Sequence, residues 1–109
     1  MNFKEIGEKI DLDEDEYLEM IELFVESGGE DLNNLEAAIK EADAGKAHQA
    51  SHSIKGSSGS LMLDTIYEIA KSMDDILRTG TVDNVEEMLT KLRSEYETIK
   101  MAFLKKRGE

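Results

Sequence analysis

The chain has 109 residues, neither cysteine nor proline, and a formal net charge of −12. This length suits a single domain, and the lack of cysteine excludes a disulfide framework or a thiolate zinc site. So many carboxylates disfavour binding to nucleic acid or to an anionic membrane surface, because like charges repel. The N-terminus does not resemble a signal peptide, and no apolar run is long enough to span a bilayer. We therefore expect one cytoplasmic domain over residues 1–109.

The first half of the chain is patterned as helices. Apolar spacing predicts a short leading helix over about residues 2–9. A longer amphipathic helix follows, with Asp11 or Asp13 as its cap, and Ser27-Gly28-Gly29 is expected to end it. Residues 30–44 repeat the same apolar spacing and predict a further helix.

The second half continues this pattern. A helix is expected over about residues 46–61, where a shift in the apolar phase indicates a break. Residues 65–68 resemble a capping box that opens a new helix, and residues 79–81 end it. A second capping-box pattern at residues 83–86 opens the last helix, which is expected to reach about residue 106.

Amphipathic helices joined by short turns predict an all-α fold. Its expected architecture is an antiparallel four-helix bundle with a short additional N-terminal helix. The apolar stripes of these helices are expected to form the core, and no strand pattern or tandem repeat is present.

The helix at residues 46–61 has an unusual set of small and polar residues on one face. At 3.6 residues per turn, that face carries His48, His52, Lys55, Gly56 and Gly59, opposite an apolar seam of Ala47, Ala50, Ile54, Ser57 and Leu61. Glycine costs roughly 1 kcal/mol relative to alanine inside a helix, so two glycines beside a histidine need an explanation. We expect another macromolecule to approach His52 closely.

Three interpretations of His52 remain open from the residues alone. His48 and His52 have the spacing of a two-histidine metal site, but the glutamate of the zinc-protease motif is missing. A surface histidine without a special task is the second interpretation. A phosphoryl acceptor is the third, because Lys55 lies one turn away and is able to offset the charge of a phosphoryl group. In that case Asp74 or Asp75, on the following helix, is expected to hold the second imidazole nitrogen.

The stretch His52-Ser53-Ile54-Lys55-Gly56-Ser57-Ser58 resembles the His-x-Leu/Ile-Lys-Gly-Ser/Ala-Ser/Ala signature of histidine phosphotransfer (HPt) domains. These domains are four-helix bundles of two-component phosphorelays. Residues 11–24, Leu35 to Ala38 and Met73-Asp74 also resemble the family pattern, so the resemblance covers about residues 11–80. The chain departs from the family at Met62, where glycine is common.

The resemblance implies roles for individual residues. It makes His52 the phosphorylated residue and Lys55 its charge partner. Asp74 falls where the family has the Glu or Gln that hydrogen-bonds the active imidazole. Gly56 is implied as the small position that lets a receiver domain dock, and we assign His48 and Gly59 to the same partner-binding surface.

The resemblance also implies a phosphocarrier and not an enzyme. No Walker-type or other glycine-rich phosphate loop is present, so we expect no ATP site, no cofactor and no metal. The implied partners are the receiver domain of a response regulator, a hybrid histidine kinase, or both, and we expect a monomer. Met20, Met62 and Leu63 are candidates for an apolar docking patch near His52. The alternative is a helical-bundle adaptor that binds a partner protein without being phosphorylated.

Overall fold

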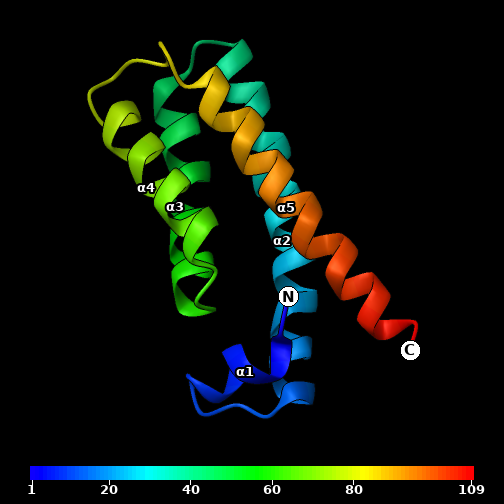
Figure 1. Ribbon diagram of the computed structural model, residues 1–109. Helices are drawn as coiled ribbons and strands as arrows, with labels where there is room; N and C mark the ends of the chain where they lie inside the picture. Colours follow the sequence, from blue (N-terminus) through cyan, green and yellow to red (C-terminus); the bar gives the residue numbers. More distant parts are fainter.

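The computed structural model describes residues 1–109, which form five α-helices and no strand. The helices are α1 (Phe3–Glu8), α2 (Glu14–Lys40), α3 (Ala44–Ser60), α4 (Asp64–Leu77) and α5 (Glu86–Arg107). The four longer helices stand together as a bundle, and α1 lies against the beginning of α2 at one end (Figure 1). The predicted four-helix bundle with a short N-terminal helix is confirmed.

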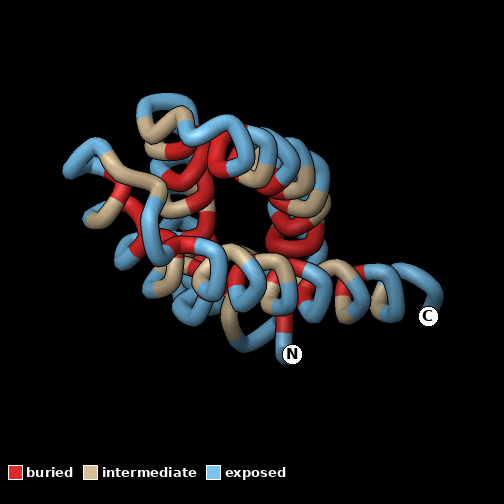
Figure 2. Tube along the Cα trace, turned by 90° about the horizontal axis from the view of Figure 1, so that it is seen from above, coloured by how far each residue is buried: buried red, intermediate tan, exposed pale blue.

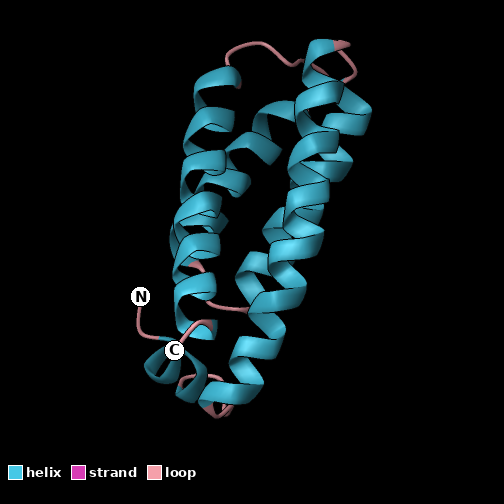
Figure 3. Ribbon diagram, turned by 90° about the vertical axis from the view of Figure 1, so that its right-hand side faces the viewer, coloured by secondary structure: helices cyan, strands magenta, loops and turns pink.

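The four long helices contact one another in chain order, and α5 closes the ring against α2. They run alongside each other for most of their length (Figure 3), and only short loops separate α2 from α3 and α3 from α4. Helices α2 and α5 extend beyond the turn that joins α3 to α4 (Figure 1). The antiparallel return of α4 along α3 places residues from both helices on one side of the bundle.

Apolar side chains fill the space between the four helices, so the buried part of each helix faces inward (Figure 2). Tyr17, which is fully buried, donates a hydrogen bond of 2.5 Å to the Leu61 carbonyl and joins α2 to the end of α3. Burial, together with the nearby charge of Asp64, raises the pKa of Tyr17 to about 12. None of the helices combines the length and apolar content that crossing a membrane requires.

Helix α2 does not end at Gly28 and Gly29, contrary to the prediction from sequence. Gly28 is buried against the rings of Phe24 and Tyr96, and a Cβ at Gly29 would lie 2.8 Å from the Tyr96 hydroxyl. That hydroxyl donates to the Val25 carbonyl on α2. The glycines therefore allow Tyr96 of α5 to pack closely against a continuous helix.

The starts of α2, α4 and α5 differ in how they are capped. Asp13 caps α2 in a complete capping box, as the sequence allowed. The two capping boxes predicted for α4 and α5 do not form, because α4 begins at Asp64 and α5 at Glu86 without a side-chain cap. The preceding residues, Leu63 and Val85, are buried and anchor the two turns in the core instead.

The turn after α3 reverses the chain within three residues. Met62 has a φ of 59°, in the left-handed region that favours glycine. The Met62 amide donates to the Gly59 carbonyl, and the Leu63 amide donates to the Ser58 carbonyl at 2.9 Å. These two bonds form a Schellman motif, so the turn keeps its glycine-type geometry without a glycine at its left-handed position.

The buried seam of α3 differs slightly from the predicted one. Ala47, Ala50, Ile54 and Leu61 are buried as expected, whereas Ser57 is only half-buried. Ser51 and Ser58 are fully buried in its place, and each donates its hydroxyl to a carbonyl of the preceding turn. Because these small side chains satisfy their own hydrogen bonds, α4 is able to pack closely against α3.

Candidate functional site

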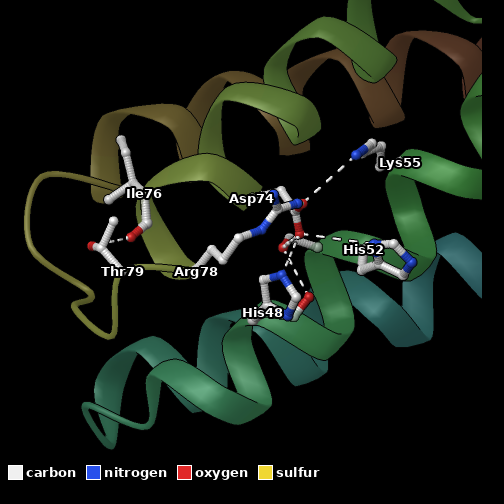
Figure 4. A network of polar contacts seen from close by, with 8 residues as sticks. His48, His52, Lys55, Asp74, Ile76, Arg78 and Thr79 are labelled. Atoms are coloured by element: carbon white, nitrogen blue, oxygen red, sulfur yellow. Dashed lines mark hydrogen bonds and ion pairs between the residues drawn. The ribbon is translucent and has the colours of Figure 1, made fainter.

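Polar side chains from α3 and α4 meet around a single carboxylate. His48, His52 and Lys55 lie on successive turns of α3, Asp74 lies in the last turn of α4, and Arg78 directly follows the end of that helix. All four of the other side chains point toward Asp74 (Figure 4). The structure thus brings together the three residues predicted for the chemistry, His52, Lys55 and Asp74.

Asp74 has no exposed surface, which is uncommon for a charged side chain. Its Oδ2 accepts a hydrogen bond of 2.9 Å from Arg78 and lies 3.7 Å from the Lys55 ammonium group. Its Oδ1 accepts a longer bond of 3.4 Å from the Ser51 hydroxyl. A buried carboxylate is tolerated only when it is paired and hydrogen-bonded, and two cations supply that pairing here.

The two histidines share the other side of Asp74. Oδ1 lies 3.0 Å from His48 Nε2 and 4.0 Å from His52 Nδ1. The His48 contact is not aligned as a hydrogen bond, and the His52 distance is too long for one. The two rings are stacked with centroids 5.9 Å apart. The expected hydrogen bond from His52 to Asp74 is therefore absent in this structure, although the two groups are neighbours.

His52 presents its imidazole to solvent, with 67% of the side chain exposed. The surface beside it at Gly56 is open, since a Cβ there would meet no atom within 4 Å. Gly59 is different, because a Cβ at that position would lie 3.2 Å from the Tyr67 ring of α4. The small size of Gly59 thus serves packing between α3 and α4, while that of Gly56 leaves space next to His52.

Sequence reasoning missed two members of this cluster. Arg78 makes the shortest hydrogen bond to Asp74, and the buried Ser51 hydroxyl donates to the other oxygen of the same carboxylate. The spacing of four residues between Asp74 and Arg78 is a signal that was available, because such pairs meet on a helix surface. Asp75, the other candidate carboxylate, is exposed and takes no part in the cluster.

The surroundings of His52 suit a large partner better than a small ligand. Five surface hollows are lined by residues other than His52, Lys55 and Asp74. Of the residues expected in an apolar docking patch, Met20 and Met62 are 42% and 39% exposed, whereas Leu63 is buried. No group of three or more His, Cys, Asp or Glu side chains is arranged to hold a metal ion.

The sequence over residues 19–102 matches the model of a family described as the Hpt domain. This chain belongs to the Hpt domain family. Its fold is similar to that of the histidine-containing phosphotransfer protein B (HptB) from Pseudomonas aeruginosa PAO1, with a TM-score of 0.79 and 25% sequence identity. The match covers 87% of this chain and 83% of that one. A search of curated proteins finds no match.

Hpt domains are phosphocarriers that interact with receiver domains in phosphorelays. Membership of the family therefore gives this chain a histidine phosphotransfer role. The resemblance stated from the sequence motif is confirmed at the level of family, fold and role.

Proposed function

We propose that His52 is the phosphoryl acceptor of this Hpt domain. It would relay the group between a sensor kinase or receiver-domain aspartate and a response regulator. The observation that carries the proposal is the pairing of an exposed imidazole with a fully buried carboxylate at its Nδ1 side. This leaves Nε2 free to attack phosphorus, while Nδ1 stays beside Asp74.

The surroundings of His52 support the same role. The product of transfer is a phosphohistidine that carries negative charge, and Lys55 lies one helical turn away with its ammonium 3.7 Å from Asp74. A modest rotation of this side chain would bring its charge to the phosphoryl oxygens. Gly56 leaves space beside the ring for the receiver that supplies the aspartate and its divalent cation.

In this proposal the domain is a carrier that does not phosphorylate itself. The catalytic machinery for transfer belongs to the receiver or kinase that docks over His52. We therefore expect no labelling of the domain by ATP alone.

The proposal is tested with receiver domains from the same host, each labelled at its aspartate with radioactive acetyl phosphate. The label is expected to move to the wild-type domain and to His48→Gln, but not to His52→Gln. It should be stable to alkali and labile to acid, as expected for phosphohistidine. Acetyl phosphate without a receiver serves as the control for direct labelling.

Two results would overturn the proposal. Persistent labelling of His52→Gln would move the acceptor to another residue. If a receiver binds the domain but no host receiver transfers label to the wild type or to His52→Gln, a non-phosphorylated adaptor is favoured.

A further inference from the structure

The site contains two imidazoles and only one carboxylate oxygen for them. Arg78 binds Asp74 Oδ2 with a hydrogen bond of 2.9 Å, and Lys55 lies on the same side. This leaves Oδ1, which is 3.0 Å from His48 Nε2 and 4.0 Å from His52 Nδ1 (Figure 4). Oδ1 also accepts from the Ser51 hydroxyl at 3.4 Å, so three groups share the two lone pairs of this one oxygen.

Asp74 Oδ1 interacts more strongly with His48 than with His52. The Nε2 of His48 is buried but has no aligned hydrogen-bond partner. An unpaired buried polar atom costs free energy, so the His48 ring gains by rotating until Nε2 points at Oδ1. Only 32% of the His48 side chain is exposed, compared with 67% for His52. Water therefore competes less with Asp74 for His48 than for His52.

We propose that His48 is a positioning residue that restrains phosphoryl transfer by competing with His52 for Asp74 Oδ1. The inference rests on the proposed role of His52 as the acceptor. In the resting state Oδ1 stays beside His48. Transfer proceeds from the arrangement in which Oδ1 has moved to the Nδ1–H group of His52.

The chemistry of transfer explains why this competition matters. A bond forms between His52 Nε2 and phosphorus, while the bond between phosphorus and the receiver's aspartate oxygen breaks and leaves its electron pair on that oxygen. His52 Nδ1 keeps its proton, so the imidazole gains positive charge in the transition state. A carboxylate oxygen within hydrogen-bond distance of Nδ1–H stabilises that charge. An oxygen held by His48 stabilises it less, and the barrier is higher.

The test is the maximum rate of transfer from a labelled receiver at saturating receiver concentration. His48→Phe keeps an aromatic ring against His52 but removes the nitrogen that competes for Oδ1. We expect its maximum rate to rise roughly 2- to 10-fold, the range that one additional hydrogen bond of ordinary net strength provides. His48→Gln keeps an amide donor that is able to reach Oδ1, and its rate is expected to rise less than that of His48→Phe.

The coupling to Asp74 is measured with a double-mutant cycle. In the Asp74→Ala background, His48→Phe is expected to leave the rate unchanged. Without the Asp74 carboxylate, removing His48 cannot make an oxygen available to His52. The Nδ1–H proton of His52, observed by NMR in the Asp74-containing proteins, should move downfield in His48→Phe as its hydrogen bond to Asp74 forms. Circular dichroism establishes that each variant is folded, and His48→Leu replaces His48→Phe if the latter unfolds.

An unchanged or slower rate in folded His48→Phe, with wild type labelled at His52, would overturn this inference and leave the proposed function standing. An equal rise in the presence and absence of the Asp74 carboxylate would also overturn it, because His48 would then act by another route. Failure of the wild type to accept label at His52 is the separate result that removes the proposed function itself.

Discussion

Asp74 and Asp75 are consecutive residues of α4, yet Asp74 is fully buried against α3 and Asp75 is exposed. The difference arises because neighbouring positions of a helix point about 100° apart, so only one of them faces α3. Only Asp74 therefore lies beside His52.

We predict that Asp74→Ala lowers the rate of phosphoryl transfer to His52 about tenfold, while Asp75→Ala stays near the wild-type rate. A tenfold loss is about 1.4 kcal/mol, which is near the lower end of what a hydrogen bond to a charged group contributes. The measurement is single-turnover transfer from a labelled receiver, with the fold of both variants checked by circular dichroism. A larger loss in Asp75→Ala would contradict the role given to Asp74.

Lys55→Gln is predicted to slow transfer or to shorten the lifetime of the phosphohistidine, by roughly 3- to 10-fold, because a charge-assisted contact to the phosphoryl group is lost. The lifetime is followed by the decay of label after removal of the receiver. Lys71→Gln, which removes an exposed lysine of α4, is the matched control and is expected to have no effect. Equal rates and lifetimes in Lys55→Gln and the wild type would show that the charge of Lys55 has no function in transfer.

The two glycines of α3 near His52 are predicted to respond differently to alanine. Gly56→Ala should stabilise the domain by about 1 kcal/mol, since the new Cβ meets no atom and alanine is the better helix former. Gly59→Ala should gain less, because its Cβ would press on the Tyr67 ring at 3.2 Å. Thermal unfolding compares the two variants.

Receiver binding is predicted to depend on the small size of Gly56. Gly56→Leu is expected to weaken binding of the receiver, because its side chain would occupy the open surface beside His52. If Gly56→Leu binds and accepts phosphoryl groups like the wild type, the receiver does not dock over this position.

Met62→Gly is predicted to raise the free energy of unfolding by about 1 kcal/mol. Met62 holds a left-handed conformation with a φ of 59°, which costs a residue with a Cβ roughly 1–2 kcal/mol. Glycine avoids this cost, but it loses more conformational entropy on folding, so the net gain in stability is smaller. Gly80→Ala is the opposite control, since Gly80 has a φ of 93° and is expected to lose stability on substitution. Urea denaturation measures both. A less stable Met62→Gly would show that contacts of the Met62 side chain outweigh its backbone strain.

Alkaline pH is predicted to destabilise the domain through Tyr17. Burial raises the folded-state pKa of Tyr17 to about 12, whereas the unfolded chain has the ordinary value of 10.0. The stability due to this group is complete below pH 10 and is lost as the pH rises to about 12, by about 3 kcal/mol in total. Tyr96, whose pKa burial also raises, contributes in the same direction.

Tyr17→Phe separates the contribution of Tyr17 from that of Tyr96. The variant should be about 1–2 kcal/mol less stable than the wild type at pH 8, because the Leu61 carbonyl loses its buried hydrogen bond. Its stability should fall less steeply than that of the wild type above pH 10. Parallel pH dependences of the two proteins would show that Tyr17 does not titrate with unfolding.

The sequence pattern was a reliable guide to helices but not to every boundary. Amphipathic spacing predicted the bundle because burial of an apolar stripe follows directly from residue order. Gly28 and Gly29 misled the prediction because glycine has two uses, to end a helix and to admit a neighbouring side chain. The choice between them depends on Tyr96, which is distant in the sequence and reaches α2 only after the bundle has formed.

Residue order alone determined the helical class and the family, and it singled out His52, Lys55 and Asp74, since motif spacing and helical periodicity are properties of neighbouring residues. The tertiary structure decided what surrounds Asp74. It buried this carboxylate, bound its Oδ2 to Arg78 and placed His48 nearer than His52 to its Oδ1. These distances depend on how α4 packs against α3, and side-chain packing between two helices is set by the whole core and not by either helix alone.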